Sequence, residues 1–201
     1  MTALRVPLAL SALLYALAAA ADATAPDTKP EVPFVPTPEV VVDKMLELGK
    51  VDKKDVLYDL GSGDGRIVIT AAKRFGTRGM GVDIDPQRIK EAKENAQEAG
   101  VTDLVSFKQG DLFQTDLSKA TVVTLYLLPD VNLRLRPKLL EELKPGTRVV
   151  SHNYHMGDWK PEQTVTVTSS GNRQHTVYVW TVPERGAAGR GGAGKTEPKT
   201  N

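Results

Sequence analysis

A nine-residue stretch near the end of the first third of the chain decides the fold: it reads Tyr58-Asp59-Leu60-Gly61-Ser62-Gly63-Asp64-Gly65-Arg66. Apolar residues at 55–60 predict a short strand, and helical spacing begins at residue 65, so the stretch joins a strand to a helix. Its alternating glycines permit a tight turn and let a ligand approach bare backbone. The start of the helix adds free N–H groups. The stretch therefore predicts a ligand-binding turn.

Strands and helices alternate outward from this turn. Asp85 is a typical N-cap with Pro86 at the first helical position, and a second helix near Pro129 is expected to break at Pro137. Alternating apolar and polar residues flank Gly171-Asn172, which indicates an antiparallel hairpin. The predicted strands cover residues 55–60, 79–83, 104–109, 121–127, 147–153, 163–169 and 175–182, and the predicted helices residues 65–75, 86–99 and 129–143. This order predicts an α/β fold, a mostly parallel sheet with helices on both faces, closed by an antiparallel C-terminal hairpin.

The two ends of the chain have a different composition from this middle. Residues 1–23 carry Arg5 before an apolar run that ends in small residues, which predicts a secretory signal peptide or a membrane anchor and an exported or membrane-anchored protein. Residues 24–38 hold five prolines and predict a stiff linker. Residues 183–201 lack an apolar period and predict a disordered tail. One folded domain remains, at residues 39–182.

The overall composition excludes several classes of function. The 201 residues hold 26 Lys and Arg against 25 Asp and Glu, so the net charge of +1 gives no footprint for nucleic acid. The absence of cysteine excludes disulfides, thiolate-bound zinc, iron–sulfur clusters and a cysteine nucleophile. His152 and His155 do not predict a metal site, because a spacing of three on a strand does not put both rings on one face.

Acidic residues stand at the ends of three successive predicted strands. The turn itself lacks the last glycine of the dinucleotide fingerprint, since position 66 is Arg, and Asp59 before the glycines suits a cationic ligand better than a pyrophosphate. Asp83 follows at the distance where a carboxylate accepts ribose hydroxyls. Asp111 and Leu112 offer a carboxylate and an apolar neighbour to a flat ring with an exocyclic amine.

Taken together, these residues resemble the class I S-adenosylmethionine-dependent methyltransferases, and within them the small lysine methyltransferase family that includes the mitochondrial enzymes for the ATP synthase c-subunit and the adenine nucleotide translocase. The matching stretches cover residues 35–161. They are Val35-Pro36-Thr37-Pro38, Asp59 to Arg66, Gly81-Val82-Asp83-Ile84-Asp85-Pro86, Tyr126-Leu127-Leu128-Pro129, Leu143 to Arg148 and Ser151-His152. The resemblance implies a Rossmann-like class I methyltransferase fold, S-adenosyl-L-methionine as the cofactor and a lysine of a protein partner as the methyl acceptor.

The resemblance also implies roles for individual residues. Asp59 and the loop of Gly61, Ser62, Gly63 and Gly65 would hold the methionine end of the cofactor, Asp83 the ribose, and Asp111 and Leu112 the adenine. Tyr126 would face the transferred methyl as the catalytic residue, and the segment from Pro33 to Pro38 would form a lid over the cofactor or remain a plain linker. The N-terminal run echoes the membrane segment of the mitochondrial members, which implies membrane association.

Several alternatives stay open at this stage. A small-molecule N- or O-methyltransferase would use the same scaffold, and an exported, non-catalytic protein would keep it as a binding module. The latter arises because the N-terminus indicates export whereas the cofactor is made in the cytoplasm. Asn153 and Tyr154 would line the acceptor pocket or lie on the surface, and Tyr126 itself would otherwise be a buried packing residue.

Overall fold

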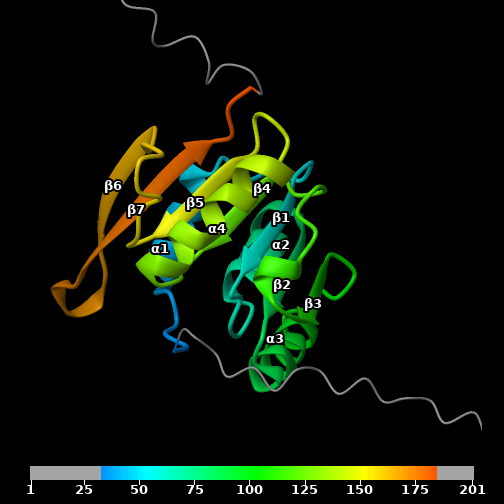
Figure 1. The fold of residues 1–201 in the computed structure, drawn as a ribbon. Coiled ribbons are helices and arrows are strands. Elements are labelled where there is room, and N and C mark those ends of the chain that lie inside the picture. Colours follow the sequence, from blue (N-terminus) through cyan, green and yellow to red (C-terminus); the bar gives the residue numbers. More distant parts are fainter. Residues whose placement is uncertain (1–32, 185–201) are drawn as a thin grey trace, which may run out of the picture.

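The computed structural model describes residues 33–184, so the predicted signal or anchor, residues 24–32 of the predicted linker and nearly all of the predicted tail lie outside the described residues. Helices and strands alternate through this part of the chain (Figure 1). The helices are α1 (Glu39–Leu48), α2 (Arg66–Phe75), α3 (Pro86–Glu98) and α4 (Pro129–Glu142). The strands are β1 (Val56–Leu60), β2 (Arg78–Asp83), β3 (Val105–Gln109), β4 (Val122–Leu125), β5 (Arg148–His152), β6 (Gln163–Thr168) and β7 (Gln174–Thr181).

The seven strands form one sheet in the order β3-β2-β1-β4-β5-β7-β6. The first five in sequence pair in parallel, and β7 pairs antiparallel with both β5 and β6, which confirms the predicted fold class. The hairpin turns through Gly171 and Asn172, whose φ angles are 71° and 58°. Because parallel strands point the same way, the carboxyl ends of β1 to β5 share one edge of the sheet. The strands that follow β1 are added on one side of it and those from β4 onward on the other side, so the topological switch point lies between β1 and β4.

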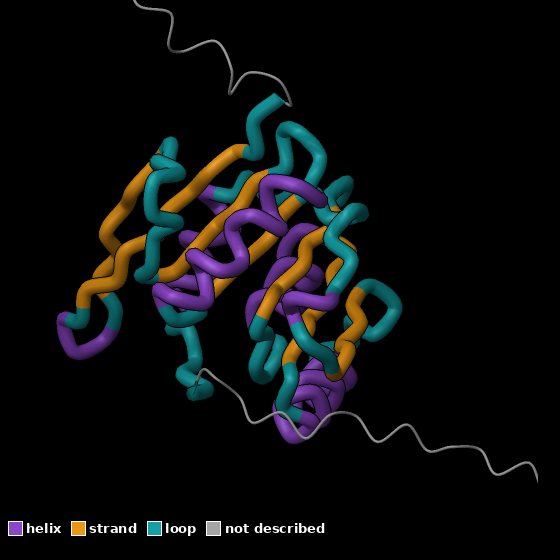
Figure 2. Tube along the Cα trace, viewed as in Figure 1, coloured by secondary structure: helices purple, strands orange, loops and turns teal. Residues whose placement is uncertain are grey.

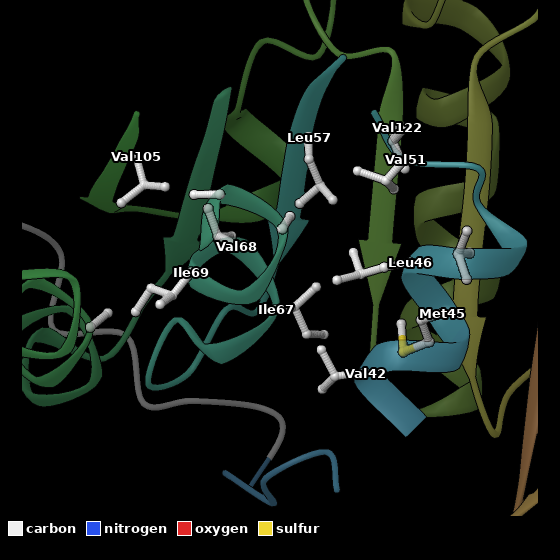
Figure 3. Close-up of a cluster of buried hydrophobic side chains, with 14 of the residues drawn as sticks. Val42, Met45, Leu46, Val51, Leu57, Ile67, Val68, Ile69, Val105 and Val122 are labelled. Atoms are coloured by element: carbon white, nitrogen blue, oxygen red, sulfur yellow. The ribbon is translucent and has the colours of Figure 1, made fainter. Parts of the chain in front are cut away.

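Helices cover both faces of the sheet, as the purple segments of Figure 2 show around the orange strands. One apolar cluster joins α1, α2 and α3 to the sheet, and Figure 3 shows Met45, Leu46 and Ile67 from α1 and α2 meeting at its centre. A second cluster packs α4 against the opposite face through Val131, Leu135 and other side chains. Burial on both faces explains why the central strands read as continuous apolar runs.

Two details of the predicted elements were wrong. Helix α4 continues through Pro137 without the expected break, because Pro137 lies on the exposed side, where water can hydrate the carbonyl that lacks an N–H partner. Strand β4 ends at Leu125 rather than at residue 127, so Tyr126 begins a loop at the carboxyl edge. No helix within residues 33–184 has the length and apolar character needed to cross a bilayer.

Candidate active site

A cavity of about 620 Å³ opens at the carboxyl edge of the sheet, where the strand order reverses. Its wall is drawn from the segment before α1, the glycine loop after β1, the end of β2, and the segments after β3 and β4. Of the residues singled out in the sequence, seven line it: Asp59, Gly61, Ser62, Asp83, Asp111, Leu112 and Tyr126. Gly63 and Gly65 shape the loop without being lining residues.

Gly63 is the position where the loop most requires glycine. Its φ angle of 53° is left-handed, and a Cβ atom there would stand 2.2 Å from the Phe34 ring. Phe34 comes from residues 33–37, all of which line the cavity and which we call the strap. The strap is held further by Arg88, whose guanidinium lies 4.7 Å from the Phe34 ring centroid. This end of the predicted linker therefore lies against the glycine loop.

Asp59 is a buried carboxyl at the floor of the cavity, only 2% exposed. It stands beside Thr124 in the parallel register of β1 and β4, and the Thr124 hydroxyl donates to its Oδ1 at 2.7 Å. Burial raises the Asp59 pKa to about 7 against the opposing effect of this hydrogen bond, and the nearby Asp83 and Asp64 raise it further. A cationic ligand group would stabilise the ionised form.

Asp83 ends β2 and braces the glycine loop. Its Oδ2 accepts from the Gly63 N–H at 2.8 Å and its Oδ1 from the Asp85 N–H at 3.0 Å. The sequence pattern did not predict the hydrogen bond between Asp83 and Gly63, because it forms only when the loops after β1 and β2 come together in the fold. Asp111 similarly caps the short helix after β3, accepting from the Phe113 N–H at 2.8 Å.

Aromatic rings gather at the end of the cavity near β4 and β5. The Tyr126 ring lies against that of His152, with centroids 3.8 Å apart, and stacks near Tyr154 at 6.3 Å. Burial raises the Tyr126 pKa, opposed by a hydrogen bond with Asn153. Asn153 and Tyr154, whose place the sequence left open, thus lie beside Tyr126 without being lining residues.

His152 is fully buried and neutral. Burial lowers its pKa to about 3, and the neighbouring His175 lowers it further. His155 does not join it, because its Nδ1 accepts from the Gly157 N–H at 2.9 Å. Within residues 33–184, no group of three His, Asp or Glu side chains is placed to hold a metal ion.

Comparison with known proteins identifies this arrangement. The model of the ANTKMT methyltransferase domain matches residues 59–163. The chain belongs to this family. It is 52% identical over 156 residues to a protein-lysine N-methyltransferase of Saccharolobus islandicus, covering 77% of this chain and 96% of the relative. It is 35% identical over 151 residues to the mouse adenine nucleotide translocase lysine N-methyltransferase, covering 74% of this chain and 63% of the relative.

A crystal structure of a relative extends the match to the cofactor. An RNA methyltransferase from Salinibacter ruber, in complex with S-adenosyl-L-homocysteine, is 63% identical, has a TM-score of 0.70, and covers 75% of this chain and 95% of that chain. This methyltransferase therefore uses S-adenosyl-L-methionine, as predicted. The activity is S-adenosylmethionine-dependent methyl transfer.

The cavity of this methyltransferase fits its cofactor. The Ser62 hydroxyl lines the cavity, is buried, and has no hydrogen-bond partner among the described residues. An unpaired buried hydroxyl is costly, and a polar group of the bound cofactor would satisfy it. Asp59 and Asp83 would offer carboxylates to the cationic and hydroxyl groups of the cofactor, and Leu112 and Phe113 would offer apolar surface to a ring. Phe113 and the strap residue Phe34 are lining residues that the sequence analysis did not single out.

Proposed function

We propose that this methyltransferase modifies lysine side chains of a protein substrate. The observation that carries the proposal is the charge of the cavity wall, which has more carboxylates than guanidiniums. Five aspartates stand there against three arginines, and each arginine has a partner: Arg66 pairs with Asp64, Arg88 with Asp85 and Glu91, and Arg134 lies over the Phe113 ring. The wall keeps an excess of negative charge even after the single net positive charge of S-adenosylmethionine is added, so it attracts a cationic side chain and repels the phosphates of a nucleic acid.

The aromatic end of the cavity suits an amine that must become neutral. A lysine amine has a reference pKa of about 10.4, and an apolar, uncharged surrounding lowers that value by desolvation. Tyr126 and His152 provide such surroundings, since both are neutral at physiological pH. When bound, S-adenosylmethionine supplies an activated methyl group, so the protein has only to orient the amine and exclude water. The Tyr126 hydroxyl is our candidate for orienting the amine.

Relatives support two acceptor classes by name. The archaeal relative is named for protein lysine, and the Salinibacter relative for RNA. The net charge of +1 and the acidic cavity wall favour the protein acceptor. We therefore treat RNA methylation as the outcome that would overturn the proposal.

The test incubates the full chain and methyl-tritiated S-adenosylmethionine with an RNA-free protein extract and, separately, with total RNA. The proposal predicts label in the protein fraction that acid hydrolysis releases as methylated lysine. Label confined to RNA, or released from protein as another amino acid, would overturn it. Heat-denatured protein serves as the inactive control in both arms, and the Asp83→Ala variant, at a low S-adenosylmethionine concentration, should label less in the arm where the wild type labels.

Export of the enzyme stays a prediction that rests on residues 1–23. Sequencing the N-terminus of the mature protein tests it. A start between residues 20 and 25 would support a cleaved signal, and a retained Met1 would exclude one.

A further inference from the structure

Four side chains form a continuous hydrogen-bonded chain from the strap to the C-terminal hairpin. Thr37 Oγ1 lies 3.2 Å from His152 Nδ1, and His152 Nε2 lies 2.9 Å from His175 Nδ1. His175 Nε2 then lies 2.9 Å from Ser169 Oγ. Three of the four are almost fully buried: Thr37 is 4% exposed, His152 0% and Ser169 8%. A buried polar chain of this kind is stable only when every donor meets an acceptor.

The direction of this chain is set by its two ends. Only one direction gives all four hydrogens an acceptor. In it the Ser169 hydroxyl donates to the Arg173 carbonyl oxygen, 3.4 Å away, whereas the reverse direction leaves the Thr37 hydroxyl hydrogen without an acceptor among the described residues. A neutral imidazole has one N–H and one lone pair, so each link fixes the next. His175 Nε2–H therefore donates to Ser169, and His152 Nε2–H donates to His175. His152 Nδ1 is left as an acceptor, and the Thr37 hydroxyl donates to it.

Both histidines are held in the neutral form that this direction requires. Burial lowers the pKa of His152, and burial together with Arg173 lowers that of His175. The titratable or charged groups placed against the pair are Tyr126 at the end of β4 and Arg173 before β7. Tyr154, which follows β5, lies on the far side of the Tyr126 ring. The chain therefore keeps one direction through the physiological pH range.

The Thr37 hydroxyl donates its only hydrogen to His152 Nδ1, so the Thr37 oxygen can take part in a further hydrogen bond only as an acceptor. Thr37 lines the cavity, as does Tyr126, and both contact the His152 ring. The backbone of Thr37 is fixed separately, since Arg66 Nη1 donates to its carbonyl oxygen at 3.0 Å. The residue is thus anchored by both its main chain and its side chain beside the candidate catalytic tyrosine.

We propose that Thr37 is a substrate-positioning residue, and that the His152–His175–Ser169 chain turns its oxygen lone pairs toward the methyl-acceptor nitrogen. This inference rests on the proposed lysine acceptor. A neutral amine would donate one N–H to Thr37 Oγ1, which leaves the nitrogen lone pair free to face the methyl group. The two histidines are positioning residues as well, because they act through Thr37 and not on the substrate.

The test is a double-mutant cycle on the full-length protein, with the lysine substrate identified by the labelling experiment above. Thr37→Val removes the hydroxyl at nearly constant volume and is expected to lower kcat about tenfold, whereas Thr37→Ser restores most of the rate. His175→Phe breaks the chain and is expected to lower kcat about threefold. The double variant is expected to match Thr37→Val alone, because the histidine then has nothing left to position.

Several outcomes would overturn the inference. A Thr37→Val enzyme with the wild-type kcat removes Thr37 from substrate positioning. Losses that multiply to about thirtyfold in the double variant show that His175 acts independently of Thr37. His155→Phe, which alters the histidine outside the chain, is the matched control and should keep the wild-type kcat.

Two further measurements distinguish a failure of this inference from misfolding of a variant and from a failure of the proposed function. The dissociation constant of S-adenosylmethionine, measured by calorimetry, should stay within about twofold of the wild-type value in every variant. If His175→Phe does not fold, the kcat of Thr37→Val compared with that of Thr37→Ser decides whether the Thr37 hydroxyl positions the substrate. A wild-type chain that labels no lysine refutes the proposed function. An active wild type with an unaffected Thr37→Val variant refutes only this inference.

Discussion

The two ends of the cavity are built in different ways. At the cofactor end, backbone N–H groups close by in sequence hold Asp83 and Asp111, and Gly63, the partner of Asp83, is only 20 residues away. Asp59 is the exception, because it accepts from the Thr124 hydroxyl. At the acceptor end, side chains hold one another across long separations, as Thr37 and His152 do over 115 residues. Tyr126 adds a ring contact with His152 there.

This difference separates binding from turnover. The carboxylates at the cofactor end should govern affinity for S-adenosylmethionine, since the cofactor would join their hydrogen bonding as a donor. Side chains at the acceptor end should govern the turnover rate, because they lie near the methyl acceptor and away from most of the cofactor. Four changes test this division, taken from the largest expected effect to the smallest.

Asp83→Ala should weaken S-adenosylmethionine binding about 10- to 100-fold, the scale of lost hydrogen bonds to a charged group. The loss combines the predicted ribose contacts with release of the Gly63 and Asp85 N–H groups. Isothermal titration calorimetry measures it, and Asp103→Ala, on the exposed turn before β3, is the matched control. Unchanged affinity would remove Asp83 from the cofactor site.

Tyr126→Phe should lower turnover about tenfold and leave cofactor affinity within about twofold. The ring contact with His152 survives this change, and only the hydroxyl is lost. Single-turnover methylation and calorimetry on the same preparation give both quantities. Equal turnover in the two proteins would make Tyr126 a packing residue.

The pKa of Asp59, raised to about 7, makes cofactor affinity depend on pH. The ligand-free protein is most stable when Asp59 is protonated, so its stability falls as the pH rises through 7. The ionised form binds a cation, so affinity for S-adenosylmethionine should rise about eightfold between pH 6 and 7.5. Asp59→Asn cannot ionise, and its weaker affinity should stay flat over this range; a parallel rise in both proteins would assign the effect to another group.

Gly63→Ala should weaken cofactor binding about fivefold, or about 1 kcal/mol, because its Cβ displaces the Phe34 ring from the cavity wall. The left-handed backbone conformation also lowers the stability of the fold, but this cost is the same with and without the cofactor. Gly171→Ala, left-handed but with open space at its Cβ, carries the same backbone cost far from the cavity. Its cofactor affinity should equal that of the wild type. Equal losses in both variants would mean that the strap contact plays no part.

The same difference between the two ends of the cavity explains which features could be predicted from the sequence alone. The fold and the cavity-lining positions of Asp59, Asp83 and Asp111 followed from strand periodicity and from the rule that parallel strands end at one edge. The continuity of α4 through Pro137 did not, because it depends on which side of the helix faces water.

Contacts between distant segments were also beyond the sequence pattern. His152 was considered with His155, its neighbour in the chain, yet its partners are Thr37 and His175 from the strap and from β7. Nothing in local periodicity indicates such a pairing. The roles of the cofactor-binding residues and of Tyr126 stay predictions that the variants above decide.

The most direct test of the account is thermal unfolding of the full chain with S-adenosylmethionine, with NAD as the control. At about 100 times its dissociation constant, the cofactor should stabilise the fold by about 2.7 kcal/mol. For a domain of this size the midpoint then rises by about 5–10 °C. The account predicts this rise with S-adenosylmethionine and none with NAD. An unchanged midpoint with both, or an equal rise with both, would contradict it.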